Sequence, residues 1–164
     1  MSNKKNISAA QMVDSFLRRT AVCVTIVAFI YGVQAFEFIA PAAIADRIDS
    51  LTLVLSILVL VLMLPSFLRF TIFRRSENCR QAEADSYMAD RFKLAAHHAF
   101  TATFVCLILL QAISRAFEAE IAHLPVAFFL DMALAVSLGA FGVGFYLLVR
   151  ENHDEDLDEW EQDE

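Results

Sequence analysis

The sequence predicts an all-α membrane protein whose four transmembrane helices form two antiparallel hairpins, followed by a disordered acidic C-terminal tail. Three observations predict this fold class: long apolar stretches, short links within each pair, and acids concentrated at the C-terminus. Each stretch can cross a hydrocarbon core about 30 Å thick at 1.5 Å of rise per residue. The four stretches span about 20–40, 51–70, 95–114 and 124–149.

Composition supports a single membrane domain. The chain has 164 residues, of which 58% are hydrophobic and 20% charged. A soluble domain of this length would interrupt its apolar runs sooner. We therefore divide the chain into a cytoplasmic N-terminal segment (1–17), a transmembrane domain (18–150) and a cytoplasmic acidic tail (151–164).

Lysine and arginine counts predict the orientation. Two basic residues, Arg47 and Arg115, flank one side of the four stretches, and eleven flank the other. Because basic residues favour the cytoplasmic side, both termini and the central loop should be cytoplasmic. Compactness and short loops favour a bacterial inner membrane. The eleven are Lys4, Lys5, Arg18, Arg19, Arg69, Arg74, Arg75, Arg80, Arg91, Lys93 and Arg150.

The first stretch has an alternative interpretation. Lys4 and Lys5, an apolar run and the small residues Ala43 and Ala45 resemble a cleaved secretory signal. The run exceeds the usual 7–15 residues of a signal core, and Pro41 lies beside the cleavage position. We therefore favour a retained first span.

The second and third stretches differ in character. The second is mostly Leu, Val and Ile and should face lipid most widely, with a kink at Pro65. Good helix formers from Ala82 to Leu94 predict that the third helix begins in the cytoplasm and enters the membrane without a break.

The fourth stretch carries small residues at helical spacing. Such residues allow close approach of helices in lipid. They predict a face for a protein partner or for self-association, formed by Ala133, Ser137, Ala140 and Gly144, with a second row at Ala135 and Gly139.

Polar residues inside the spans form a candidate cluster. Ionisable groups at membrane depth are unfavourable and suggest function. If the last hairpin turns near His123, Arg115 lies level with Asp131 and should pair with it. We favour a structural ion pair over a substrate or proton site. The cluster comprises Gln34, Glu37, Gln111, Arg115 and Asp131, with Glu118 on the same face as Arg115.

The sequence gives little support for catalysis or for cofactor and metal binding. The sequence lacks the G-x-S-x-G, H-E-x-x-H and phosphate-loop motifs. Cys23, Cys79 and Cys106 should avoid oxidising compartments, and adjacent His97 and His98 are poorly placed for one haem. We expect no catalytic residues, cofactor, metal or nucleic-acid partner.

The tail holds nine acids between Glu151 and Glu164, and these repel one another. Leu157 and Trp160 lie three residues apart and would share a helical face. We favour a solvated tail that aids solubility, and the alternative is a short motif that docks a partner through Trp160. The sequence therefore favours a non-enzymatic accessory, assembly or regulatory subunit of a membrane complex. The alternative is a component of a transporter or of a proton- or ion-handling system that uses the polar cluster.

Overall fold

The computed structural model describes residues 9–74 and 86–162, with the side chains of 9, 10, 42, 43, 46, 73, 74, 120 and 151–162 outside the description. Its helices are α1 (Ala9–Glu37), α2 (Ala42–Arg74), α4 (Tyr87–Ala116), the short α5 (Glu118–Ile121) and α6 (Val126–Gln162). Helices are required because lipid offers no hydrogen-bond partner to exposed backbone groups. Four of them, α1, α2, α4 and α6, are long and apolar enough to cross a membrane.

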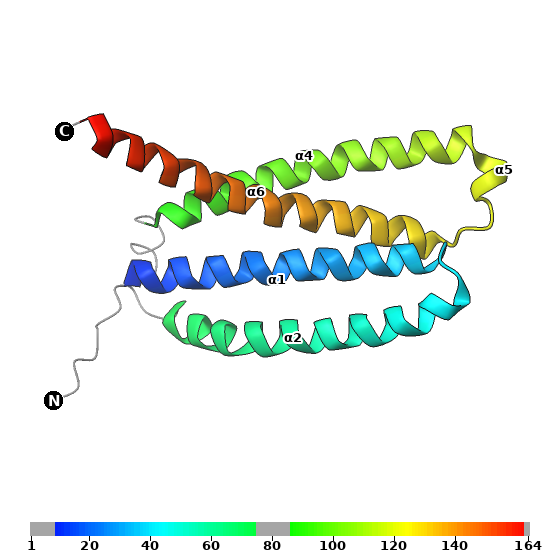
Figure 1. Cartoon of the computed structure of the whole chain (residues 1–164), viewed down its shortest axis with the longest axis horizontal. Helices are drawn as coiled ribbons and strands as arrows, with labels where there is room; N and C mark the ends of the chain where they lie inside the picture. Colours follow the sequence, from blue (N-terminus) through cyan, green and yellow to red (C-terminus); the bar gives the residue numbers. More distant parts are fainter. Residues whose placement is uncertain (1–8, 75–85, 163–164) are drawn as a thin grey trace.

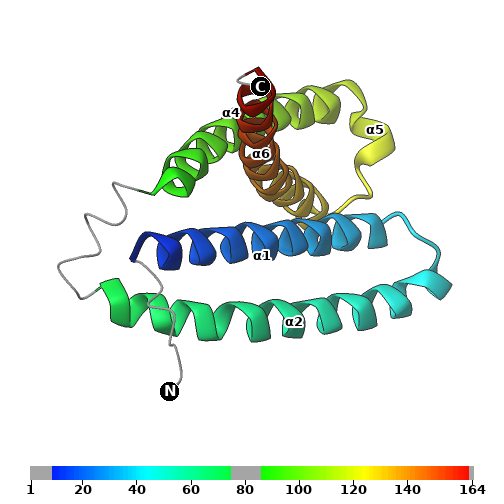
Figure 2. The same cartoon turned by 60° about the vertical axis from the view of Figure 1, so that its left-hand side comes forward.

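The four long helices lie side by side in the order α2, α1, α6, α4 (Figure 1). α1 is central and packs against α2 on one side and α6 on the other, while α4 covers α6 (Figure 2). The start of α1 and the ends of α2 and α6 lie at one end of the molecule, which we call the terminal end. The loop before α2 and the α5 segment lie at the other end, the loop end.

Local signals set the helix starts. Pro41 and Pro125 precede α2 and α6, and their carbonyls accept hydrogen bonds from the Ile44 and Phe128 nitrogens at 2.9 and 3.1 Å. Proline suits these positions because the first helical N–H groups have no intrahelical partner. Ser86 caps α4, accepting a hydrogen bond from the Ala89 nitrogen at 3.1 Å. As expected, α4 then continues unbroken to Ala116.

The core lies where α1, α4 and α6 meet. Phe141 and Phe145 of α6 are buried against small residues of the other helices, Ala21, Ala95 and Ala99. Phe92 meets the Phe141 ring edge-on, with 4.7 Å between centroids. Alanines on α1 and α4 thus make room for the aromatic rings of α6.

α4 departs from α6 beyond this core. Its buried residues are Ala89, Ala95 and Ala99, all in its first half. None of residues 103–116, here called distal α4, is buried. Both views show α4 and α6 separating toward α5 (Figures 1 and 2).

The C-terminal segment differs from the prediction of a disordered tail, because α6 continues as a helix through Gln162. A physical reason is that nucleation, the unfavourable step, is already complete in the span. No glycine or proline follows Gly144, and glutamate favours helices.

Candidate functional site

Small residues of α6 contact α1 within the same chain. A Cβ on Gly32 would lie 3.8 Å from the Ala135 Cβ, and one on Gly139 would lie 3.8 Å from the Ala28 Cβ. The second row of small residues, Ala135 and Gly139, therefore faces α1. The face predicted for a partner is half-buried in this chain at all four positions, Ala133, Ser137, Ala140 and Gly144.

The α1–α6 register also locates part of the polar cluster. Gly32 lies opposite Ala135, and Ala28 lies opposite Gly139. The two helices are therefore antiparallel, and moving one residue forward along α1 corresponds to moving one residue backward along α6. The same register places Asp131 opposite residue 36, next to Glu37. Phe38 and Phe128, whose ring centroids are 6.4 Å apart, agree with it. Gln34, Glu37 and Asp131 are thus at similar depth, and all three are half-buried.

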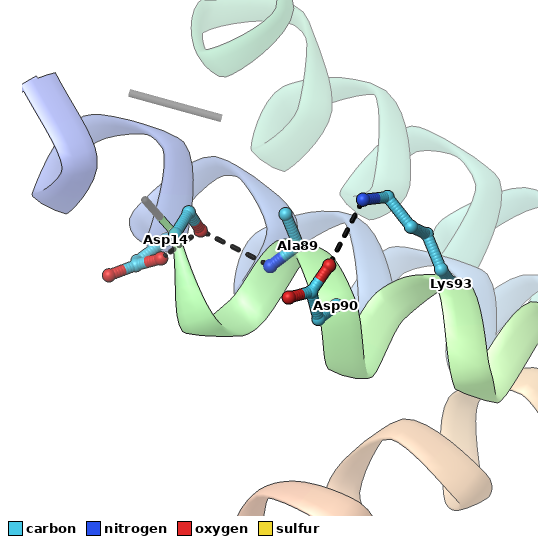
Figure 3. Close-up of polar contacts among 5 residues, drawn as sticks. Asp14, Ala89, Asp90 and Lys93 are labelled. Carbon is cyan, nitrogen blue, oxygen red and sulfur yellow. Dashed lines mark hydrogen bonds and ion pairs between the residues drawn. The ribbon is translucent and has the colours of Figure 1, made fainter. Parts of the chain in front are cut away.

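The expected Arg115–Asp131 ion pair is not formed. An ion pair does form between Lys93 and Asp90, at 3.0 Å on the first half of α4 (Figure 3). Arg115 and Gln111 are exposed on distal α4, whereas Asp131 is half-buried on α6, which packs against α1. The physical reason lies in the segment that connects the two spans. This segment contains α5, which comes before His123, so the chain does not turn at His123 as expected. In addition, α4 and α6 diverge toward α5.

A polar contact joins α1 to the start of α4. The Ser86 hydroxyl donates to Asp14 Oδ1 at 2.6 Å while its oxygen caps the Ala89 nitrogen (Figure 3). Ser86 is only 2% exposed. One buried hydroxyl therefore both caps α4 and joins it to α1.

The described cavities gather around Arg19 near the terminal end. Two lie between α1 and α2 and together form what we call the Arg19 groove. The larger, of about 450 Å³, is lined by Arg19 and by Val22, Cys23, Val61, Leu62 and Pro65. The smaller, of about 150 Å³, is lined by Arg19, Ser66, Arg69, Phe16 and Phe70 among others.

Two contacts between α1 and α2 frame this groove. An Arg19 guanidinium nitrogen donates to the buried Ser66 hydroxyl at 2.9 Å. The rings of Phe16 and Phe70 stack with centroids 4.1 Å apart and planes 2° from parallel. A third cavity, between α1 and α4, is lined by Asp14, Arg18 and Arg19 among others.

Sequence reasoning missed the Arg19 groove because it treated Arg18 and Arg19 only as orientation signals. A usable signal was present: an arginine at the start of one span and Pro65-Ser66 near the matching end of the next. Antiparallel neighbours place such positions at similar depth. The side chains of Leu157 and Trp160, predicted to dock a partner, lie outside the described residues.

Comparison with known proteins adds no assignment. No family model matches this chain, and no curated protein or solved structure shows significant similarity to it. Among the described residues no group of three or more His, Cys, Asp or Glu side chains is arranged to hold a metal ion.

Proposed function

We propose that this protein is a non-enzymatic accessory, assembly or regulatory subunit of a membrane complex, and that it contacts its partner through distal α4. The observation that carries the proposal is the shared face of Gln111 and Arg115. Both side chains are exposed, in the part of the span that leaves α6. Gln111 lies five residues inside the candidate span that ends at Ala116, where a polar group is unfavourable against lipid and favours a polar or aqueous neighbour.

Distal α4 also offers apolar surface for such a partner. Phe104 and Ile108 are more than half exposed on this segment. The small residues of α6 are half-buried within the chain, so distal α4 is the more open surface. A partner helix with polar side chains would satisfy Gln111 and cover these apolar groups.

Photo-crosslinking in native membranes tests this proposal. A photoreactive amino acid at Ile108 should give a discrete protein adduct, and Arg115→Leu should weaken that adduct. The matched control is Leu60, an equally apolar and exposed position on α2, which should give lipid adducts only. Protein adducts at neither position, or equally at both, would contradict a partner on distal α4.

The orientation we propose is that the terminal end is cytoplasmic, in a bacterial inner membrane. Its support is charge. Arg18 and Arg19 lie in the first half of α1, Lys93 in the first half of α4, and Arg69 and Arg150 in the last halves of α2 and α6. These are the halves of the four helices that point to the terminal end (Figure 1). Arg47 and Arg115 lie near the loop end. An excess of Lys and Arg favours the cytoplasmic side.

The acidic segment supplies a second proposed contact. Leu157 and Trp160 would anchor a cytoplasmic partner, and the surrounding acids would guide it. Deleting residues 154–164 should leave membrane insertion intact and remove a co-purifying protein. Retention of every co-purifying protein by the truncated chain would rule out this contact.

A second candidate function is proton or ion handling, favoured by the α1–α6 register, in which Asp131 and Glu37 lie at similar depth. Glu37→Gln with Asp131→Asn should then abolish proton flux in vesicles containing the purified protein. Glu118→Gln, at an exposed carboxylate near the end of α4, is the control. Equal flux in all three proteins, or none in the wild type, would exclude this candidate.

A further inference from the structure

We propose that the Arg19 groove binds one anionic phospholipid, with the phosphate between Arg19 and Arg69 and an acyl chain beside Pro65. Arg19 lines both cavities of the groove, so a charged region and an apolar region adjoin. A phospholipid has the same two parts in the same order. This inference concerns α1 and α2 and is independent of the partner proposed for distal α4.

The charged region is built to receive an anion. Arg19 uses one of its five N–H groups on Ser66 at 2.9 Å, which holds the guanidinium between the two helices. Arg69 makes no hydrogen bond or ion pair with the described residues, and it lines the same cavity. Arginine binds phosphate oxygens through two parallel hydrogen bonds, which makes it well suited to this group.

Among the described residues, no acidic side chain lines this region, since the residues that line the two groove cavities include no aspartate or glutamate. Asp14 belongs to the neighbouring cavity between α1 and α4, where it accepts the Ser86 hydroxyl at 2.6 Å. The charge of the groove is therefore positive and favours an anionic lipid over a zwitterionic one.

The apolar region suits an acyl chain. Val22, Cys23, Val61 and Leu62 line it with Pro65, and its volume of about 450 Å³ is typical of ligand cavities. Pro65 has no N–H, so this turn of α2 lacks the usual hydrogen bond to the Val61 carbonyl. The apolar cavity therefore lies beside the turn of α2 that lacks this backbone hydrogen bond.

The depth of the two regions also fits a lipid. The membrane-spanning part of α2 ends at Ile72, so Arg69 lies within one turn of that boundary and the apolar cavity lies further inside. Phosphates of a bilayer occupy this boundary, and basic pockets between transmembrane helices bind anionic head groups there. The stacked rings of Phe16 and Phe70 line the cavity that Arg19 and Arg69 share.

Native mass spectrometry of the full chain in a nonionic detergent tests the proposal. The protein is titrated with phosphatidylglycerol and, separately, with phosphatidylcholine carrying the same acyl chains. One phosphatidylglycerol should bind more tightly than phosphatidylcholine, and Arg19→Gln and Arg69→Gln should each weaken it about fivefold. Leu62→Trp should weaken both lipids by filling the apolar region.

Two controls make the outcome decisive. Arg47→Gln removes an exposed arginine from the other end of α2 and should leave binding unchanged. Arg69→Gln removes no hydrogen bond or ion pair with the described residues, so it remains informative if Arg19→Gln misfolds. Equal binding of both lipids, or equal loss in the Arg47 and Arg69 variants, would overturn the proposal. Displacement of phosphatidylglycerol by inorganic phosphate at matched concentration would identify a free-anion site instead and would also overturn it.

Discussion

Gly142 is the tightest point of the contact between α1 and α6. A Cβ at this position would lie 3.1 Å from the Thr25 Cβ and 3.3 Å from the Thr25 Cα. The Thr25 hydroxyl is already bonded to the Ala21 carbonyl at 2.9 Å, which fixes this side chain. The nearest atom is Thr25 Oγ1, which a rotamer change could move, but the close contacts with the Thr25 Cβ and Cα would remain.

Gly142→Ala should therefore destabilise the protein by about 1–3 kcal/mol, the usual range for overpacking. Gly144→Ala is the matched control, because a Cβ there meets nothing within 4 Å. Thermal unfolding in detergent, followed by circular dichroism, measures the difference. A melting midpoint for Gly142→Ala equal to that of Gly144→Ala would refute the close approach of α6 to α1.

Ser86 is the second residue on which packing depends. Ser86→Ala removes the cap of α4 and the donor to Asp14 together, and should lower stability by about 1–2 kcal/mol. Ser86→Asp keeps an acceptor for the Ala89 nitrogen but places a carboxylate against Asp14. That variant should be less stable than wild type and should be rescued by Asp14→Asn, whose amide can donate.

Ser56→Ala, at an exposed serine within α2, is the control for the Ser86 variants. Melting midpoints of the single and double variants measure the coupling between Ser86 and Asp14. If Asp14→Asn lowers the stability of Ser86→Asp further, the two side chains are not in contact.

At the scale of elements, α2 depends on α1 for its attachment. α2 packs mainly against α1, and most of its large apolar side chains are exposed. Phe70 is half-buried and stacks on Phe16, while Phe67 on the same helix is 52% exposed. A few specific contacts therefore attach an otherwise lipid-facing helix.

Phe70→Ala should then lower the melting midpoint, by roughly 2–4 °C for each kcal/mol lost. The aromatic pair contributes about 0.5–1.5 kcal/mol beyond its buried area. Phe67→Ala removes a ring of the same size from an exposed position and should have little effect. Equal losses in the two variants would show that the Phe16–Phe70 stack does not attach α2.

The same scale shows what the sequence could and could not predict. Span-length helices were predictable because crossing a membrane requires about twenty apolar residues in a row, which a single chain displays directly. As predicted, four helices are long and apolar enough to cross a membrane. The relative depth of Arg115 and Asp131 was not predictable, because it depends on α5 and on the divergence of two helices. The Arg19 groove likewise depends on which helices become neighbours.

At the scale of the whole molecule, the basic residues are distributed unevenly along the long axis. The terminal end holds Arg18, Arg19, Arg69 and Lys93, whereas Arg47 and Arg115 lie toward the other. This asymmetry matters because moving basic residues across a membrane is unfavourable. The start of α1 and the end of α6 both lie at the terminal end, as an even number of crossings would place them.

Reporter fusions should accordingly report one compartment for both ends of the chain. A reporter active only in the cytoplasm should function when fused before residue 1 or after residue 164, and it should fail when inserted after Pro41 or His123.

Substituting Arg18, Arg19 and Arg69 together by Gln, with Arg residues added beside Pro41, should reduce or reverse this orientation bias, since charge near the span ends sets orientation. The same substitutions keep every span apolar, so membrane insertion itself should persist and serves as the internal control. Activity at only one of the two ends in the unmodified protein would mean an odd number of crossings, and would contradict the position of the described termini at one end of the molecule.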